Sequence, residues 1–254
     1  YVANGQFDVY NNVISGIRVS RTGDIFVTVP RWKQGIPSSF CKLVSNPNGP
    51  GFVLDPWPNW EFNQLNRTGS LQFGQAMWID SSNNMWIIDV GRVNFFDSNP
   101  SSVVNGAPMI YILDTVSGAV QSTYTFPNSV LPYNNSFLND IVLDEGSGWA
   151  YLTNSIAAGG ILAYDNNTRR SHMWVSASTG RNASFDVCVD AYCYGTDGIG
   201  TAPADGIALS SDGQVLYWCP IQGEGLYAIN TTYLHDFDMS NEEFEDKTVY
   251  LGCL

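Results

Sequence analysis

The sequence GIRVSRTGDIFVTVP at residues 16–30 is one of four versions of a single pattern. The others are AMWIDSSNNMWIIDV at 76–90, DIVLDEGSGWAYLTN at 140–154 and GIALSSDGQVLYWCP at 206–220. Each consists of a short alternating segment, a polar turn and a second segment rich in aromatic and β-branched residues. Because this pattern and turn chemistry are typical of two paired antiparallel strands, each stretch predicts a β-hairpin.

The hairpins recur at nearly regular intervals. Equivalent residues Ile17, Met77, Ile141 and Ile207 are 60, 64 and 66 residues apart. Weaker strand patterns lie between them, at 109–114, 119–126, 160–165, 171–175, 225–229 and 247–251. About four strands per repeat is the content of one β-propeller blade, so the sequence predicts an all-β propeller. Stacked β-sandwiches are the less favoured alternative, because they do not repeat a hairpin at near-fixed spacing.

Long polar segments separate the predicted strands. Residues 31–66, 94–108 and 175–204 are predicted to be loops on the faces of the propeller, where binding surfaces are commonly built. The acidic stretch NEEFED at 241–246 is expected to be a solvated loop. No segment has a helical apolar period long enough to predict a core helix.

Charge and hydropathy exclude several kinds of partner. The 254 residues include 24 Asp and Glu but only 11 Lys and Arg, giving a formal net charge of −13. Nucleic acid binding requires clustered cations, so a nucleic acid partner is not expected. Docking on an anionic membrane is equally disfavoured. No apolar run approaches the roughly 20 residues that span a bilayer, so membrane insertion is not expected.

Glycosylation sequons and cysteine spacing indicate the cellular compartment to which the protein is directed. The Asn-X-Ser/Thr sequon occurs five times, at Asn66, Asn134, Asn166, Asn182 and Asn230. Five sequons beside turn-like sequence predict a secreted glycoprotein. Cys188 and Cys193 are expected to form a disulfide in that oxidising setting, whereas two reduced thiols are the alternative. The absence of a Cys-X-X-Cys pair argues against zinc, and the pairing of Cys41, Cys219 and Cys253 is left open.

Five phrases in this order resemble the major royal jelly protein and yellow family. They are IFVTVPRWKQGIPSSF (25–40), DPWPNWE (55–61), MWIIDVG (85–91), SFLNDIVLD (136–144) and DGIALSSDGQVLYWCP (205–220). The resemblance implies a secreted six-bladed propeller whose central channel binds small molecules at its mouth. Within the family, it implies three roles: conversion of dopachrome, sequestration of biogenic amines, and assembly into nutritive or structural oligomers.

The length of the chain conflicts with six blades. At about 63 residues per repeat, 254 residues provide about four to five blades. We therefore expect residues 1–254 to form a single, incomplete propeller domain that lacks a C-terminal blade. Three explanations remain: a longer natural chain, closure of the ring by another polypeptide, or a ring with fewer blades.

Polar residues beside the repeated hairpins are the candidate ligand site. The innermost strand of each blade lines the channel, so these residues are expected at its mouth. They are Trp78, Asp80, Asp89, Asn139, Asp140 and Asp205. Their carboxylates suit a cationic amine or, less favourably, a metal ion. The alternative is that Asp and Asn bond local backbone N–H groups in turns. No metal or cofactor is predicted.

Aromatic residues in the long loops have two possible roles. Trp32, Trp57, Trp60, Tyr192 and Tyr194 either stack on an aromatic amine or, as we favour, pack the loops against the core.

Catalysis has little support in the sequence. No Gly-X-Ser-X-Gly motif is present; His172 reads as structural, and His235 lies in an acidic stretch expected to be exposed. The leading hypothesis is a secreted glycoprotein that binds a small aromatic or amine ligand, or assembles as a homo- or hetero-oligomer. An enzyme that converts dopachrome-like oxidised catechols and a subunit of an extracellular filament or coat are the alternatives. Between these hypotheses, the sequence favours a protein that is not an enzyme, and the question stays open.

Overall fold

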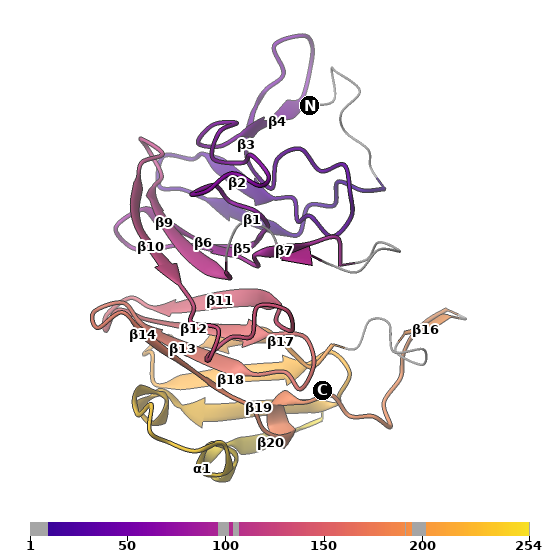
Figure 1. Cartoon of the computed structure of the whole chain (residues 1–254), viewed down its shortest axis with the longest axis vertical. Coiled ribbons are helices and arrows are strands. Elements are labelled where there is room, and N and C mark those ends of the chain that lie inside the picture. The colour runs from indigo at the N-terminus through magenta and orange to yellow at the C-terminus, as the bar shows by residue number, and fades with distance from the viewer. Residues whose placement is uncertain (1–9, 96–101, 104–106, 191, 195–201, 254) are drawn as a thin grey trace. The chain divides into compact units, whose positions relative to one another are not determined.

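The computed structural model describes residues 10–95, 102–103, 107–190, 192–194 and 202–253. These residues contain four four-stranded antiparallel sheets (Figure 1). The chain divides into two compact units, residues 1–128 and 129–254. Each unit contains two of the four sheets.

The first unit contains the strands up to residue 125. Its first sheet has the order β1 (Gly16–Val19), β2 (Ile25–Thr28), β3 (Phe40–Ser45) and β4 (Phe52–Pro56). Its second sheet has the order β5 (Gly74–Ile79), β6 (Asn84–Asp89), β9 (Met109–Asp114) and β10 (Val120–Thr125). A short pair, β7 (Arg92–Val93) and β8 (Ser102–Val103), lies between β6 and β9 in the chain.

The second unit repeats this arrangement. One sheet has the order β11 (Leu138–Asp144), β12 (Trp149–Asn154), β13 (Ile161–Asp165) and β14 (Arg170–Trp174). The other has the order β17 (Ala204–Leu209), β18 (Val215–Pro220), β19 (Gly225–Asn230) and β20 (Val249–Cys253). Along the chain, β14 is followed by the 3-10 turn η2 (Ala177–Thr179) and by the hairpin of β15 (Val187–Val189) and β16 (Tyr192–Tyr194), before β17 begins. The 3-10 turn η3 (Thr231–His235) and helix α1 (Asn241–Lys247) lie between β19 and β20.

The four predicted hairpins are confirmed, and each forms the first two strands of one sheet. The equivalent residue pairs ten positions ahead in the first unit, Ile17 with Val27 and Met77 with Ile87. It pairs eleven positions ahead in the second unit, Ile141 with Leu152 and Ile207 with Trp218. The all-β prediction is therefore confirmed. The number of blades in the propeller and the single-domain assignment stay predictions.

Two predicted loops contain hairpins. Residues 31–66 include strands β3 and β4, joined through the turn sequence SNPNGPG at 45–51. Residues 175–204 include β15 and β16, in which Cys188 lies directly opposite Cys193. Asn, Pro and Gly around these short strands gave both segments the composition of a loop.

The acidic stretch at 241–246 is not a loop but part of helix α1, so that prediction is wrong. Ser240 begins the helix with a capping box, in which its hydroxyl accepts from Glu243 N and the Glu243 carboxylate accepts from Ser240 N. Phe244 is fully buried and stacks between Trp174, 5.8 Å away, and Trp218, 5.7 Å away. One buried aromatic residue thus fixes a helix whose other residues are largely solvated.

Each unit has an aromatic core between its sheets. In the first unit, Phe26 and Phe40 pack with Met77 and Tyr111 in one buried cluster. In the second, the indole nitrogens of Trp174 and Trp218 donate to Met239 O and Ser178 O, each over 3.0 Å. Because buried indole N–H groups require acceptors, these bonds fix the connection from β14 to β17 at Ser178 and the segment between β19 and β20 at Met239.

Candidate functional site

The candidate site lies where strands β11 and β17 begin side by side. Asn139 and Asp205 each stand two residues before the equivalent isoleucine of their repeat. The Asn139 side-chain amide donates to Asp205 O over 3.4 Å, and the Thr153 hydroxyl donates to the same carbonyl over 2.9 Å. Two residues of the predicted site are therefore in direct contact.

The first unit joins its two inner strands in the same way. Ser15 and Thr28 both donate their hydroxyls to Gln75 O, over 3.2 and 3.0 Å. Ser15 and Gln75 stand at the repeat position that Asn139 and Asp205 occupy in the second unit. The hydrogen-bonded seam is thus a repeated element of the fold. What differs is the side chain at its end: a neutral amide at residue 75 and a carboxylate at residue 205.

The second-unit side chains form a group that we call the acidic cluster, defined as Asn139, Asp140, Ser155 and Asp205. The pKa of the half-buried Asp205 carboxyl is raised, first by burial and further by the negative charge of Asp140. Hydrogen bonds from Ser155 and Asn139 partly oppose that rise in pKa. Two neighbouring carboxyl groups that disfavour each other's charge are an arrangement that a bound cation relieves.

One member of the acidic cluster, Ser155, and two of its neighbours, Thr153 and Cys219, were not predicted from the sequence. The Ser155 hydroxyl donates to Ala204 O over 2.6 Å as well as bonding Asp205. Thr153 supports the Asp205 carbonyl, and Cys219 lies opposite Gly206 in the strand pairing. Burial, followed by the charge of Asp205, raises the pKa of the Cys219 thiol, which keeps it protonated. The sequence signal was the polar run TNS at 153–155, at the end of the hairpin predicted for 140–154.

Asp80 forms part of the turn between β5 and β6. Its carboxylate accepts from Ser82 N and Asn84 N, over 2.9 and 2.8 Å. It also accepts from the indole nitrogen of Trp86 over 3.0 Å. These bonds match the local, turn-capping alternative for this residue.

Asp89 lies at the other end of the same hairpin. It is almost fully buried and accepts from Gln72 N, Phe73 N and Gly91 N, over 2.7, 2.9 and 2.9 Å. Burial raises its pKa, and the three backbone donors and the charge of Arg31 oppose the rise. Asp89 pairs with Gly74 at the start of β5, whereas Asp80 follows the end of β5. The structure therefore does not bring these two carboxylates together.

Trp78 lies on β5 opposite Trp86, and the guanidinium of Arg18 lies 5.1 Å from its ring centre. Its partners thus come from β6 and from the neighbouring sheet of the same unit. Only Asn139, Asp140 and Asp205 of the predicted ligand site form one cluster.

Comparison with known proteins assigns the chain to a family. The family model described as "Major royal jelly protein" matches residues 75–252. This chain belongs to the major royal jelly protein family. It is 25% identical to protein yellow of Drosophila melanogaster over 237 residues, which is 87% of this chain and 42% of that protein. It is 25% identical to protein yellow of Drosophila yakuba over 96% of this chain and 46% of that protein. The chain thus spans less than half the length of these relatives.

A solved structure shares the fold of this royal jelly family member. Hydrazine synthase from Kuenenia stuttgartiensis superposes with a TM-score of 0.54 at 11% sequence identity. The match covers 92% of this chain and 57% of that one, and it concerns the fold alone.

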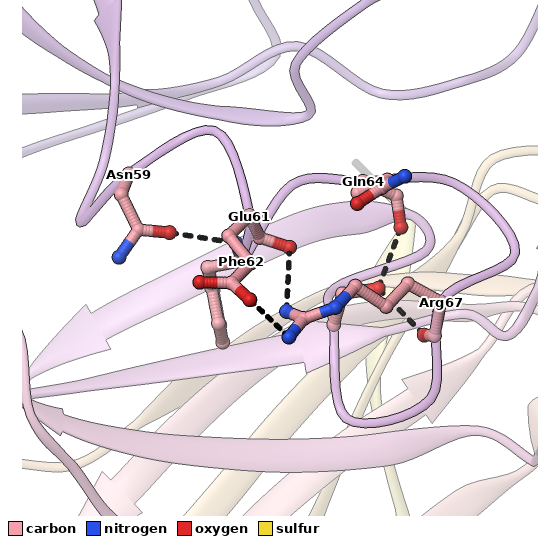
Figure 2. Close-up of polar contacts among 6 residues, drawn as sticks. Asn59, Glu61, Phe62, Gln64 and Arg67 are labelled. Atoms are coloured by element: carbon pink, nitrogen blue, oxygen red, sulfur yellow. Dashed lines mark hydrogen bonds and ion pairs between the residues drawn. The ribbon is translucent and has the colours of Figure 1, made fainter.

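The five sequons of this royal jelly family chain lie in different surroundings. Asn66, Asn134, Asn182 and Asn230 are exposed, whereas Asn166 is half-buried and accepts from Tyr164 Oη over 3.0 Å. Asn66 lies in the loop that follows β4, shown in Figure 2. There Arg67 forms an ion pair with Glu61, Asn59 accepts from Phe62 N over 2.8 Å, and Ser70 donates to Gln64 O over 2.6 Å.

The predicted disulfide between Cys188 and Cys193 is present. Cys41, Cys219 and Cys253 are free thiols, respectively buried, half-buried and exposed. Within the described parts of the chain, no group of three or more His, Cys, Asp or Glu residues is arranged to hold a metal ion. Nor does any helix among those residues have the length and apolar character to cross a membrane.

Of the loop aromatic residues, Trp57 has the predicted core-packing role. Trp57 packs edge-on against Phe26 and Phe40, with ring centres 4.8 and 5.6 Å apart, so it anchors its loop to the core. Trp60 is 51% exposed, and Trp32 is half-buried. The side chains of Tyr192 and Tyr194 lie outside the described residues.

The two histidines of this family member contact aromatic residues. His172 is half-buried, with its ring centre 4.6 Å from that of Trp174, in keeping with a structural role. His235 is exposed but stacks on Trp149 at 4.1 Å and bonds Tyr151 Oη through Nε2 over 2.9 Å. Burial lowers the pKa of both imidazoles.

Proposed function

We propose that this protein is a secreted, N-glycosylated royal jelly family member that binds a small amine at the acidic cluster. The observation that carries the proposal is the contact of Asn139 with Asp205 across the starts of two adjacent inner strands, where the charge of Asp140 also acts on the Asp205 carboxyl. Burial and mutual repulsion raise the pKa of Asp205, so a bound ammonium group lowers the free energy of the ionised pair.

The surrounding polar groups support orientation of the amine. Ser155 and Asn139 hydrogen-bond the Asp205 carboxyl, and the backbone N–H of Ile141 donates to Asp140 over 2.8 Å. These contacts fix the carboxylates before a ligand arrives, which lowers the entropic cost of binding. Secretion and glycosylation are supported by family membership, the disulfide and four exposed sequon asparagines.

Calorimetric titration with three probes tests the proposal. Tyramine contains an aromatic ring and an ammonium group, 4-ethylphenol contains the ring alone, and butylamine contains the ammonium alone. We expect tyramine and butylamine to bind and 4-ethylphenol to bind far more weakly. Because a hydrogen bond to a charged group contributes about 1.5–3 kcal/mol, Asp205→Asn is expected to weaken tyramine binding by about 10–100-fold.

Asp212→Asn is the matched control. Asp212 lies in the turn between β17 and β18, where it accepts from Ser210 Oγ and Gln214 N. The substitution removes the same charge from the same sheet and is expected to leave binding unchanged. Equal weakening by both substitutions, or equal binding of all three probes, would contradict a specific amine site.

Two further measurements separate the alternative functions. The binding protein is expected to leave the rate of dopachrome decay unchanged. Acceleration that Asp205→Asn abolishes would instead favour the enzyme hypothesis. Native mass spectrometry is expected to detect monomer with bound amine, whereas an oligomer that forms without amine would favour assembly.

A further inference from the structure

A pocket in the second unit has a glycosylation sequon on its wall. Its volume is about 300 Å³. It is lined by the segment around Arg181 and Asn182, the turn around Glu224, and the rings of Tyr227 and Tyr250. Asn182 is the acceptor residue of the sequon Asn182-Ala183-Ser184. The pocket is formed by different strands and loops from those of the acidic cluster.

The backbone around Asn182 is fixed beside the pocket. Asn182 N donates to Gln222 O over 2.7 Å, and Asn182 O accepts from Phe185 N over 3.0 Å. The side-chain Oδ1 accepts from Ser184 N over 2.9 Å. These bonds use the carbonyl oxygen of the amide and leave Nδ2, the atom that carries an N-linked sugar, for the glycan.

The pocket wall has an open aromatic surface. The rings of Tyr227 and Tyr250 lie 5.6 Å apart, inclined at 52°. Tyr227 also stacks on Trp218, but Tyr250 is 56% exposed on strand β20. Large exposed aromatic rings beside a pocket are a surface that the apolar face of a sugar ring covers well.

Three glycines on the same wall leave the main chain accessible from the pocket. A Cβ at Gly225 would lie 2.6–2.7 Å from ring atoms of Tyr227, so a larger residue there would displace that ring. Gly180 and Gly223 also line the pocket and present peptide groups without side chains. Glu224 and Arg181 add an acceptor and a donor of hydrogen bonds at its edge. Aromatic faces, bare peptide groups and charged side chains are together suited to a hydroxylated ring carrying an amide.

We infer that this pocket holds the first N-acetylglucosamine of a glycan on Asn182, with the sugar covering Tyr250. The inference rests on the N-glycosylation in the proposed function and goes further by assigning the sugar at one sequon to a defined pocket. A tethered sugar has a high effective concentration at the pocket, so weak individual contacts suffice to hold it there.

Chemical footprinting of the secreted protein tests the inference. Tyrosine iodination is followed by peptide mass spectrometry, comparing natural protein with Ser184→Ala, which removes the sequon but retains Asn182. We expect Tyr250 to be iodinated at least about threefold faster in Ser184→Ala. Tyr233, 41% exposed in the same unit, provides the internal control and is expected to react equally in both proteins.

Glycosidase treatment and a second sequon variant sharpen the test. An endoglycosidase that leaves one N-acetylglucosamine is expected to preserve the protection of Tyr250, because only the first sugar occupies the pocket. Thr68→Ala, which removes the sequon at Asn66, is expected to leave Tyr250 protected.

The possible failures are distinguishable. Occupancy at other sequons with Asn182 unmodified, or modified Asn182 with unchanged iodination of Tyr250, overturns this inference and leaves the amine proposal standing. Absence of glycans at all five sequons overturns the inference together with the glycosylated part of the proposed function.

Discussion

Replacement of Arg31 is expected to destabilise the first unit severely. Arg31 belongs to the phrase RWKQGIP and is only 3% exposed. Its guanidinium fills the space beneath two loop segments and donates to five main-chain carbonyls. The acceptors are Ile36 O at 3.1 Å, Pro37 O at 3.1 Å, Asn63 O at 2.6 Å, Leu71 O at 3.2 Å and Gln72 O.

The number of bonds gives the magnitude. A buried carbonyl that loses its donor costs about 1–3 kcal/mol. Arg31→Met removes all five donors, so even the lower value gives about 5 kcal/mol, comparable with the 5–15 kcal/mol that stabilises a typical domain. Arg31→Lys retains the charge but has three N–H groups on one atom in place of a planar fork. At least two carbonyls then remain unbonded, at a cost of about 2–6 kcal/mol.

The loss also affects Asp89. The charge of Arg31 partly offsets the rise in the pKa of that buried carboxyl. Without Arg31 the pKa of Asp89 rises further, so the stability deficit of Arg31→Met is expected to grow as the pH increases from acid to neutral.

Urea unfolding followed by tryptophan fluorescence measures these effects. Arg67→Met is the control, because Arg67 forms an exposed ion pair with Glu61 in the loop that Arg31 supports (Figure 2). Exposed pairs contribute about 0–1 kcal/mol, so this variant should stay close to the natural protein. If Arg31→Met does not fold, Arg31→Lys still decides the matter. If the free energy of unfolding of Arg31→Lys were within about 1 kcal/mol of that of the natural protein, the five carbonyls would not depend on the guanidinium as argued.

Two further predictions concern pH. Because the pKa of Asp205 is raised, the folded state retains a proton that the unfolded state has lost, and stability falls as pH rises from about 3.9 through the folded pKa. Asp205→Asn is therefore expected to have a higher urea midpoint than the natural protein at pH 7 and no advantage near pH 3.5; a lower midpoint at pH 7 would contradict this sign. The pKa of His235 is lowered by burial, so its contribution to stability is present above about pH 6.5 and lost as pH falls through the folded pKa. The free energy of unfolding of His235→Gln is expected to change less between pH 7 and 5 than that of the natural protein. An equal change in the two proteins, measured by urea unfolding, would contradict this.

The repeated hairpins could be predicted because their signal is local. Alternation, turn residues and spacing all lie within fifteen consecutive residues, and the pairing of Ile17 with Val27 follows from them. Strands β3 and β4 were obscured by the turn sequence NPNGPG, although alternating apolar residues flank it. Helix α1 was missed because its core contribution is Phe244 alone, yet the capping box Ser240 to Glu243 was readable.

Asp80 and Asp89, at the two ends of the hairpin of β5 and β6, show why a site is harder to predict than a strand. Asp80 and Asp89 stand in one repeat and have the same chemistry. Asp80 bonds residues two to six positions away, whereas Asp89 bonds Gln72 and Phe73, 17 and 16 positions earlier. The sequence around Asp89 does not indicate that Gln72 and Phe73 are its partners. Asn139 and Asp205 are 66 positions apart, but the repeat makes them equivalent, and equivalent positions on neighbouring inner strands lie side by side.

That equivalence separates the structural role of Asp205 from its proposed function. The seam between the inner strands uses the backbone carbonyl of residue 205, which accepts from Thr153 and Asn139, as Gln75 O accepts from Thr28 and Ser15. Since any residue supplies that carbonyl, the seam itself does not require a carboxylate at this position. A carboxylate with a raised pKa costs stability there, whereas the equivalent seam in the first unit forms at Gln75, a residue with a neutral side chain. A costly charge at a position where the fold accepts a neutral residue favours a role in binding for the side chain of Asp205.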